Sequence, residues 1–359
     1  MFFFIKTKTK RKYEMEEKEF EAIDIAALQS TPDPEENQYD FVPRTFDQYL
    51  GQAELKEKLS VYSTAAKMRG EALDHLLLFG PPGLGKTTLS KIMAHVMEVN
   101  IKICSGPMLE RTGDLVAILS SMQKRDILFI DEIHRLPTAV EEVLYGAMEN
   151  FCVDVVIGQG VGAKSVTLPI QPFTLIGATT KTGMISAPLR SRFGIIERID
   201  FYNEQDLQKV VLQCAQFLKV SIQDNAALKI AKCSRGTPRI AKKILRRIRD
   251  FAQVQNKNIA HDKFVERALK FLGIDNDGLS KVDNLILKKI ITHFDGGPAG
   301  LDTIAALIGE DKDTIETVYE PFLMRKGYLE RTARGRQIPY KRLIYLKRKY
   351  LGQDTLLST

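Results

Sequence analysis

The feature that most constrains this chain of 359 residues is the glycine-rich string at 80–88, Gly-Pro-Pro-Gly-Leu-Gly-Lys-Thr-Thr. The string fits the pattern G-x-x-x-x-G-K-[ST], and it lies between a short apolar run and a helical period. A phosphate-binding loop needs this strand–loop–helix setting, because glycines let backbone N–H groups converge on phosphate oxygens at the positive end of a helix. Chance gives the pattern in roughly one random chain of this length in a hundred. The string therefore predicts a nucleotide site.

The chemistry of this site follows from the residue types. Lys86 places a positive charge on the β- and γ-phosphates, and the Thr87 hydroxyl ligates Mg²⁺. The run Ile127–Ile130 predicts a buried strand that ends in Asp131 and Glu132, the first to hold Mg²⁺ through its water shell and the second to polarise the attacking water. An Asp-Glu pair alone is commonly a solvated strand end, but the phosphate loop favours catalysis. The cofactors predicted are ATP and Mg²⁺, bound along the string by Gly83, Gly85, Lys86, Thr87 and Thr88.

Short apolar runs alternate with longer helical periods between residues 41 and 200. They are rich in Ile, Leu or Phe, which is typical of strands buried on both faces of a parallel sheet. The runs lie at 76–79, 101–103, 127–130, 173–178 and 195–199. Residues 201–275 instead have apolar positions at helical spacing, which predicts a small helical domain whose bases at 239, 242, 243, 246, 247 and 249 form a solvated helix face.

A third unit follows the turn-rich break at 275–278. Three helical periods near 283–294, 301–308 and 313–326 precede a glycine-containing alternating stretch at 327–346, which outlines three helices and a β-hairpin, as in a winged helix. The predicted fold class is therefore α/β, with a P-loop NTPase domain, an all-helical lid and a C-terminal winged helix. The predicted boundaries are 1–40 for a charged extension, 41–200 for the ATPase domain, 201–275 for the lid, 276–353 for the winged helix and 354–359 for a tail.

The extension at 1–40 begins with five Lys and Arg residues, which a run with nine acids and one lysine follows up to Glu36, with a Pro-Asp-Pro break at 32–34. Such blocks are usually disordered or a short solvated helix, and the alternative is a docking arm. Elsewhere, no apolar run approaches the roughly 18 residues that span a bilayer. The four cysteines are scattered, which predicts reduced core residues of a cytoplasmic protein and excludes a disulfide scaffold.

The net charge of +7 belongs to one end of the chain. Residues 321–353 contain ten Lys or Arg and one acid, a net charge of +9, so the remainder sums to −2. A charge run is usually a solvated surface, but three arginines crowd the expected hairpin tip and tyrosines interleave with the bases. This arrangement favours sequence-independent phosphate or minor-groove contact with duplex DNA. The predicted DNA-binding residues are Arg331, Arg334 and Arg336.

Further polar residues lie where a γ-phosphate could be sensed. Thr179 and Thr180 end the strand expected at 173–178, Arg190 and Arg192 lie on a loop, and Arg239 opens a basic helix. Taken alone, each has an ordinary explanation, since threonine often caps a strand and surface arginines are usually solvated.

Several strings together resemble the AAA+ ATPases in order and spacing: Asp-Glu-Ile-His at 131–134, Gly-Ala-Thr-Thr at 177–180 and Arg-Gly-Thr-Pro-Arg at 235–239. Three longer strings are more specific and resemble the RuvB family, bacterial motors for Holliday-junction branch migration. They are Pro-Leu-Arg-Ser-Arg-Phe-Gly at 188–194, Val-Tyr-Glu-Pro-Phe-Leu at 318–323 and Arg-Thr-Ala-Arg-Gly-Arg at 331–336. The likeness runs from about 41 to 350.

The resemblance implies a role for each matching position. Arg192 is expected to be an arginine finger that enters the neighbouring subunit's ATP site, Arg239 the second sensor, and Thr179 or Thr180, with Thr180 preferred, the first. Because such a finger makes hydrolysis depend on assembly, the resemblance implies a homo-hexameric ring. Further nucleotide contacts are implied for Phe41, Val42, Glu149, Asn150, Phe151 and Tyr202.

The resemblance also implies partners. A β-hairpin near 156–168, within the glycine-rich stretch 158–168, would bind the junction-recognition protein RuvA, although a plain surface loop is the alternative. RuvC would be a further partner. One departure is Val42, which stands where the family usually has arginine beside the adenine, so a side-chain contact there is in doubt.

The function expected is ATP-driven branch migration of Holliday junctions in homologous recombination and recombinational repair. A clamp loader or a replication initiator is the nearest alternative, which dependence on a sliding clamp or on an origin sequence would distinguish. A DNA-binding regulator that uses ATP only as an assembly switch is a further alternative. Asp131, Glu132 and Arg192 argue against the regulator.

Overall fold

The computed structural model describes residues 41–157, 164–255 and 259–352. These divide into two compact units, which we call the sheet unit, residues 41–219 with 236–242, and the helical unit, residues 220–235 with 243–352. The predictions for the extension at 1–40 and for the tail at 354–359 fall outside the described residues.

The sheet unit is built on a five-stranded parallel sheet in the order β2-β3-β6-β1-β7. Its strands confirm the apolar runs of the sequence: β1 (Leu76–Phe79), β2 (Ile101–Ser105), β3 (Ile127–Asp131), β6 (Thr174–Thr179) and β7 (Ile195–Arg198). The three central strands β3, β6 and β1 are almost wholly buried, as expected for a parallel sheet covered on both faces. Their carboxyl ends lie at one edge, where the phosphate loop follows β1 and Asp131 ends β3.

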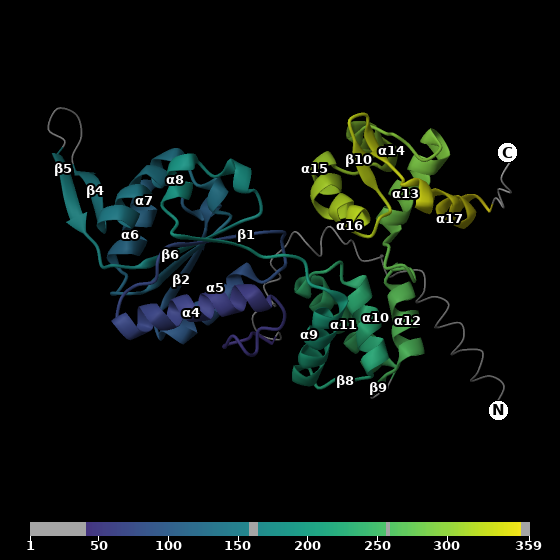
Figure 1. Cartoon of the computed structure of the whole chain (residues 1–359), viewed down its shortest axis with the longest axis horizontal. Helices are drawn as coiled ribbons and strands as arrows, with labels where there is room; N and C mark the ends of the chain where they lie inside the picture. Colours follow the sequence, from purple (N-terminus) through teal and green to yellow (C-terminus); the bar gives the residue numbers. More distant parts are fainter. Residues whose placement is uncertain (1–40, 158–163, 256–258, 353–359) are drawn as a thin grey trace, which may run out of the picture. The chain divides into compact units, whose positions relative to one another are not determined.

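Helices connect and cover these strands (Figure 1). They are α4 (Ala53–Arg69), α5 (Lys86–Met97), α6 (Thr112–Ser120), α7 (Thr138–Asn150) and α8 (Ala187–Ser191). Helix α9 (Glu204–Phe217) follows the last strand, β7, and does not cover the sheet. The apolar side of α7, including Leu144, packs with Ile130 and Phe173 in the core of this unit. An antiparallel hairpin of β4 (Cys152–Ile157) and β5 (Lys164–Pro169) projects from it (Figure 1), and residues 158–163 of the expected partner hairpin fall outside the described residues.

The lid part of the chain is helical, as predicted, with α10 (Asp224–Cys233), α11 (Pro238–Val254) and α12 (Asp262–Phe271). A two-residue pair of parallel strands, β8 (Ser221–Ile222) and β9 (Ile259–Ala260), adds to it and was not predicted. The expectation that all bases of α11 line a solvated face is wrong, because Lys243 and Arg246 are buried.

The C-terminal part of the helical unit is the winged helix. Its elements are α13 (Lys281–Phe294), α14 (Leu301–Ile308), α15 (Lys312–Thr314), a π-helical turn (Ile315–Tyr319), α16 (Glu320–Arg325), β10 (Glu330–Thr332), β11 (Gly335–Gln337) and α17 (Tyr340–Leu351). One core joins them, in which Ile290 of α13, Leu323 of α16 and Leu346 of α17 are all buried. The three expected helical periods and the wing hairpin are confirmed.

The prediction of a β-hairpin over the whole stretch 327–346 is wrong in its second half, which is helical. The hairpin ends at Gln337, and α17 begins three residues later, after Pro339. Leu343, Leu346 and Tyr350 recur at intervals of three and four residues and pack on the winged-helix core, which is a helical spacing. The short alternation around the wing turn concealed this period.

Within the described residues, no helix is both long and apolar enough to cross a membrane.

Candidate nucleotide site and DNA-binding wing

The phosphate loop links β1 to α5, as the sequence predicted, and α5 begins at Lys86 directly after Gly85. Gly80 has φ of 147° and Gly83 has φ of 77°, conformations that favour glycine. A Cβ on Gly80 would lie 2.3 Å from the backbone oxygen of Ile199 on the neighbouring strand's extension. The loop can therefore take this path against β7 only with glycine at position 80.

Lys86 is buried at the start of α5. Its Nζ donates to the backbone oxygens of Gly80 at 2.8 Å and Pro81 at 2.9 Å, so the ammonium group lies inside the curve of the loop. Burial lowers the pKa of Lys86 to about 8, and the nearby charge of Asp131 opposes this shift. The positive group is thus desolvated and held where the loop would receive phosphates.

Asp131 and Glu132 lie at the carboxyl end of β3, where the sequence placed them. The backbone N–H of Glu132 donates to Asp131 Oδ1 at 2.9 Å, and Glu132 itself has a left-handed backbone with φ of 48°. The Glu132 carboxylate accepts a hydrogen bond from Arg135 at 3.0 Å, and both side chains are about half exposed. Glu132 is therefore accessible and fixed in direction by the turn that follows β3.

The donors present fit Mg²⁺. The Thr87 hydroxyl, in the first turn of α5, and the Asp131 carboxylate are hard oxygen donors, and both carboxylates of the pair act electrostatically on Lys86 beside them. Mg²⁺ is usually held by one or two such groups together with phosphate oxygens and water. Among the described residues no cluster of three or more His, Cys, Asp or Glu side chains could hold a metal by itself, so this donor set needs the nucleotide.

The two threonines after β6 differ in position. Thr179 is buried, and its hydroxyl lies 3.0 Å from His134 Nδ1 and accepts from the Lys181 N–H at 3.0 Å. Burial lowers the pKa of His134, which favours the neutral ring beside that hydroxyl. Thr180, the preferred sensor, is exposed at the same sheet edge. The structure thus makes Thr179 a link to the Asp131 turn and leaves the Thr180 hydroxyl accessible.

A hollow lies beside the phosphate loop. It is lined by Phe41, Tyr49, Thr88, Tyr202, Gln213 and Lys242, among others. Tyr49 donates to the Leu84 backbone oxygen at 3.2 Å, and burial raises the pKa of Tyr49 to about 12, so the phenol stays neutral. Lys242 donates to the Phe41 backbone oxygen at 2.8 Å. Of the predicted residues, Phe41, Gly85, Thr88 and Tyr202 line the hollow, whereas Val42 is 37% exposed and does not.

Several members of this hollow were missed. Tyr49 and Gln213 have no motif, and Lys242 was assigned only to a solvated helix face. For Tyr49 the available signal was the segment Phe-Asp-Gln-Tyr-Leu at 46–50, ahead of the first helix, which has the aromatic and polar groups that line ligand pockets. The sequence offered no such signal for Gln213 and Lys242.

Arg239 lies against the phosphate loop, as the second-sensor prediction requires. Its backbone N–H donates to the Gly83 oxygen at 3.3 Å, and a Cβ on Gly83 would lie 3.0 Å from Arg239 Cβ. The positive charge of Arg239 also acts to lower the pKa of Lys86. The structure therefore brings Arg239, Lys86 and the loop together within one unit.

Arg192 lies elsewhere on the sheet unit, with Glu149. Its guanidinium is 3.0 Å from the Glu149 carboxylate, donates to the Pro188 oxygen at 2.7 Å and lies 4.3 Å from the centre of the Tyr145 ring. Within the described residues these contacts all lie on α7 and α8. The predicted nucleotide contacts Glu149, Asn150 and Phe151 end α7, and Phe151 packs edge-on against Phe173. The structure groups Arg192 with Glu149, and not with the phosphate loop of the same chain.

The wing brings Arg331 and Arg336 opposite each other on β10 and β11. Both guanidinium groups bond Glu320, which is only 1% exposed: Arg331 at 2.5 Å and Arg336 at 3.2 Å. Arg331 also pairs with Glu316 at 2.9 Å. Arg334 lies exposed in the turn of the hairpin. The three predicted DNA residues are therefore together, two of them oriented by acids and one at the tip.

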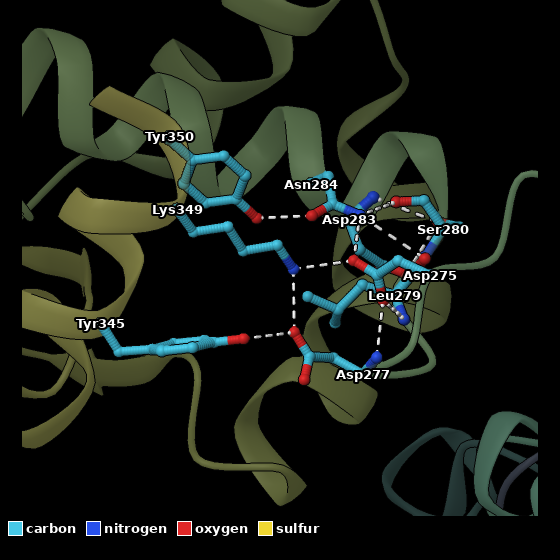
Figure 2. A network of polar contacts seen from close by, with 9 residues as sticks. All are labelled: Asp275, Asp277, Leu279, Ser280, Asp283, Asn284, Tyr345, Lys349 and Tyr350. Atoms are coloured by element: carbon cyan, nitrogen blue, oxygen red, sulfur yellow. Dashed lines mark hydrogen bonds and ion pairs between the residues drawn. The ribbon is translucent and has the colours of Figure 1, made fainter. Parts of the chain in front are cut away.

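Other bases of the C-terminal +9 segment are used inside the fold. Lys349 of α17 pairs with Asp275 at 2.7 Å and with Asp277 at 2.9 Å, while Tyr345 donates to Asp277 (Figure 2). Lys347 pairs with Asp295 at 2.6 Å. Segment 321–353 therefore presents less unpaired positive charge than its net +9, because acids outside the segment pair with some of its bases.

Three family models match successive parts of the chain. The RuvB P-loop domain of the Holliday junction DNA helicase matches residues 41–199, the RuvB AAA lid domain matches 202–275, and the RuvB C-terminal winged helix domain matches 276–347.

Relatives and solved structures agree. The chain is 52% identical over 320 residues to the Holliday junction branch migration complex subunit RuvB of Pediococcus pentosaceus, covering 89% of this chain and 95% of the relative. It is 54% identical over 299 residues to that of Staphylococcus saprophyticus, covering 83% and 90%. The solved Holliday junction branch migration motor RuvB of Thermotoga maritima superposes with a TM-score of 0.75 at 46% identity, over 88% of this chain and 99% of that one. The chain belongs to the RuvB family of Holliday junction branch migration ATPases.

Proposed function

We propose that this chain is the motor subunit of a homo-hexameric ring that hydrolyses MgATP to move Holliday junctions along duplex DNA, in homologous recombination and recombinational repair in the cytoplasm. RuvA and RuvC are the proposed partners. The observation that carries the proposal is the arrangement of Lys86, Arg239 and the Asp131–Glu132 pair around one phosphate loop, in a chain that also has a winged helix with clustered arginines.

Each residue at the loop has a separate task in the proposed reaction. Lys86 and the loop N–H groups hold the β- and γ-phosphates, Thr87 and Asp131 supply oxygen ligands for Mg²⁺, and Glu132 orients and deprotonates the attacking water. The task of Thr180 in this proposal is to contact the γ-phosphate or that water. Mg²⁺, when bound, neutralises charge on the phosphates. The hollow lined by Phe41, Tyr49 and Tyr202 receives the adenosine.

The position of Arg192 supports the proposal of a ring. An arginine finger stabilises the transferred phosphoryl group and contributes about 10³–10⁵ in rate. Arg192 is paired with Glu149 on α7 and lies with the residues predicted to contact nucleotide, Glu149–Phe151. We infer that this group faces the ATP of the adjacent subunit, so a heterologous contact repeated around a closed ring completes each site.

The wing is the proposed contact with DNA. Arg331, Arg334 and Arg336 present guanidinium groups on a narrow hairpin, which suits phosphate or minor-groove contact without base reading. A motor that passes over any sequence needs binding of this kind.

The β4–β5 hairpin is the proposed site for RuvA. Its β5 strand exposes Val166 and Leu168, apolar side chains at alternate positions, so they lie on one face of the strand. Such an exposed apolar strip on a projecting hairpin is typical of a protein-binding surface.

The test is a junction-migration assay with a four-way DNA junction, ATP and Mg²⁺, with and without RuvA. The wild-type chain should dissociate the junction, and Glu132→Gln should bind ATP while losing migration and about 10²–10⁴ in hydrolysis rate. Val166→Asp should abolish stimulation by RuvA while leaving ATP binding unchanged. If the wild-type chain hydrolysed ATP but moved no junction, either with or without RuvA, the motor function would be rejected.

A further inference from the structure

Arg235 is a buried charge between the lid and the winged helix. It follows α10 in a left-handed backbone conformation with φ of 52°, and the residue is only 2% exposed. Its place at the start of the string Arg-Gly-Thr-Pro-Arg puts it four residues before Arg239. Burying a guanidinium is costly unless it is paired and hydrogen-bonded, so its partners are informative.

These partners all belong to the winged helix. The Arg235 guanidinium forms an ion pair with Asp283 at the start of α13, donates to the Ser280 hydroxyl at 3.2 Å and donates to the Val318 backbone oxygen at 3.4 Å. It also lies 4.7 Å from the centre of the Phe322 ring and 5.6 Å from that of Tyr319. One lid side chain is therefore inserted between α13 and the π-helical turn with α16.

The start of α13 is held from its other side. Ser280 and Asp283 form a reciprocal capping box, with the Ser280 N–H donating to Asp283 at 2.8 Å. Figure 2 shows the neighbouring clamp, in which Lys349 reaches Asp275 and Asp277 and the Tyr350 hydroxyl bonds Asn284. The guanidinium of Arg235 thus meets a helix end that several polar contacts hold in place.

The π-helical turn and the start of α16 also carry the acids that bond the wing arginines. Val318, Tyr319 and Phe322 contact Arg235, whereas Glu316 and Glu320, in the same segment, hold Arg331 and Arg336. A π-helical turn is rare and often marks a functional position. Segment 315–322 thus connects the lid guanidinium to the two guanidinium groups that are proposed to grip DNA.

In the other direction along the chain, the string reaches the phosphate loop. The Gly236 oxygen accepts from the Tyr202 N–H at 2.9 Å, and the Arg239 N–H donates to Gly83 at 3.3 Å. Arg235 is therefore held by contacts within the helical unit, whereas Gly236 and Arg239 are held by contacts within the sheet unit.

We propose that Arg235 is a positioning residue that couples the nucleotide site to the DNA wing: a shift of the 235–239 string on exchange of ATP for ADP moves its guanidinium in the winged helix, and segment 315–322 re-aims Arg331 and Arg336. The inference rests on the proposed motor function and extends it. By linkage, the nucleotide changes DNA affinity by the same factor by which DNA changes nucleotide affinity.

The test measures the dissociation constant for a fluorescent duplex DNA at fixed salt, with ADP and with a slowly hydrolysed ATP analogue. The ratio of the two constants is the coupling, expected at about 5–150 in the wild-type chain. The informative variant is Arg235→Met with Asp283→Asn, which leaves no unpaired buried charge and is therefore expected to fold. The ratio of the two dissociation constants should fall to near one in this variant. Its ATP affinity and basal hydrolysis rate should stay within about twofold of wild type, because changes at distant, independent sites usually add to within that factor.

Two further variants separate coupling from packing. Arg235→Lys keeps the ion pair but removes the contact of the planar guanidinium with the Phe322 ring, so this variant should retain part of the affinity ratio. It replaces the double variant in the test if the double variant does not fold. Lys229→Met removes two ion pairs of the lid, to Asp262 and Glu266, and should leave the ratio unchanged. A merely structural Arg235 would weaken both affinities equally.

The proposal is overturned if the double variant, or Arg235→Lys in its place, keeps the wild-type ratio, or if the wild-type ratio is one. Failure of the motor function would look different, since it would show as absent junction migration in the wild-type chain while the affinity ratio stays measurable.

Discussion

The Arg192 guanidinium lies 3.0 Å from the Glu149 carboxylate of its own chain and stacks 4.3 Å from the centre of the Tyr145 ring. The side chain is thus held on α7 in an ordered position, with its Nε buried and lacking a hydrogen-bond partner within the described residues. An arginine that is pre-aligned in this way loses little conformational entropy when it meets a phosphate.

The first prediction concerns this residue. Arg192→Ala should lower ATP hydrolysis about 10³-fold or more while leaving nucleotide affinity nearly unchanged, because a finger acts mainly on the transition state. If the finger acts in trans, mixing Arg192→Ala with Glu132→Gln should restore activity, since an intact loop then meets an intact finger. Steady-state phosphate release measures both.

Arg190→Ala is the matched control, because Arg190 is exposed on α8, the short helix that ends directly before Arg192. It should hydrolyse ATP at close to the wild-type rate. A mixture of the two inactive variants that stays inactive would contradict the trans assignment.

The second prediction follows from the lowered pKa of Lys86, about 8. The charged form binds phosphates, so the affinity for ATP should be flat below pH 8 and should weaken above it, by up to roughly tenfold per pH unit, as the free protein loses the proton that the complex retains. Titration of a fluorescent ATP analogue between pH 6.5 and about 10 measures this.

Lys86→Arg is the control, because a guanidinium stays charged over this range. Whatever its absolute affinity, its profile should be flat above pH 8. An equal loss of affinity in both proteins would place the titrating group elsewhere.

The nucleotide motif and the strands were predictable because they are local. Loop geometry depends on glycines within one string, and a strand buried on both faces reads as a run of apolar residues. Only some residues of the proposed adenosine hollow could be predicted. Lys242 bonds the backbone oxygen of Phe41 and Gln213 bonds that of Gln48, and only tertiary packing brings these distant parts of the chain together.

Charge was the least predictable property. A net +9 over 321–353 gives no sign that Lys349 and Arg331 bond acids outside that segment. A count of charged residues along a segment gives only its net charge. The fold pairs some of these charges with distant acids and leaves others, such as Arg334, at the surface. The alternation around the wing turn hid α17, and only its packing against α13, far upstream, defines its apolar face.

The third prediction tests α17. Leu346 is fully buried against the winged-helix core, so Leu346→Ala should cost about 2–5 kcal/mol locally. Amide hydrogen exchange in α13 and α17 should become about 30-fold faster or more, because a loss of about 2 kcal/mol in local stability corresponds to that factor. Ile344→Ala, on the same helix but 41% exposed, should change exchange little. Equal effects of the two would contradict the observed face of α17.

The fourth prediction concerns how DNA affinity depends on salt. Removing one arginine that neutralises a DNA phosphate should reduce the slope of log affinity against log salt by about 0.9. Arg334→Gln should therefore lower the slope by about 0.9, and replacement of both Arg331 and Arg336 by glutamine should lower it by about 1.8. The second change must include Glu320→Gln, because this carboxylate is 1% exposed and would otherwise be left buried and unpaired, with a cost to folding unrelated to DNA.

Lys288→Gln supplies the control, as an exposed charge on α13 outside the wing. It should leave the slope unchanged in a fluorescence anisotropy titration over a range of salt concentrations. The two sets of wing variants also separate the contributions of tip and strands: an unchanged slope for Arg334→Gln with a reduced slope for the Arg331, Arg336 and Glu320 variant would move the contact from the turn to the strands. Unchanged slopes in both would exclude the wing as the DNA-binding surface, because a protein that neutralises fewer phosphates must release fewer counterions.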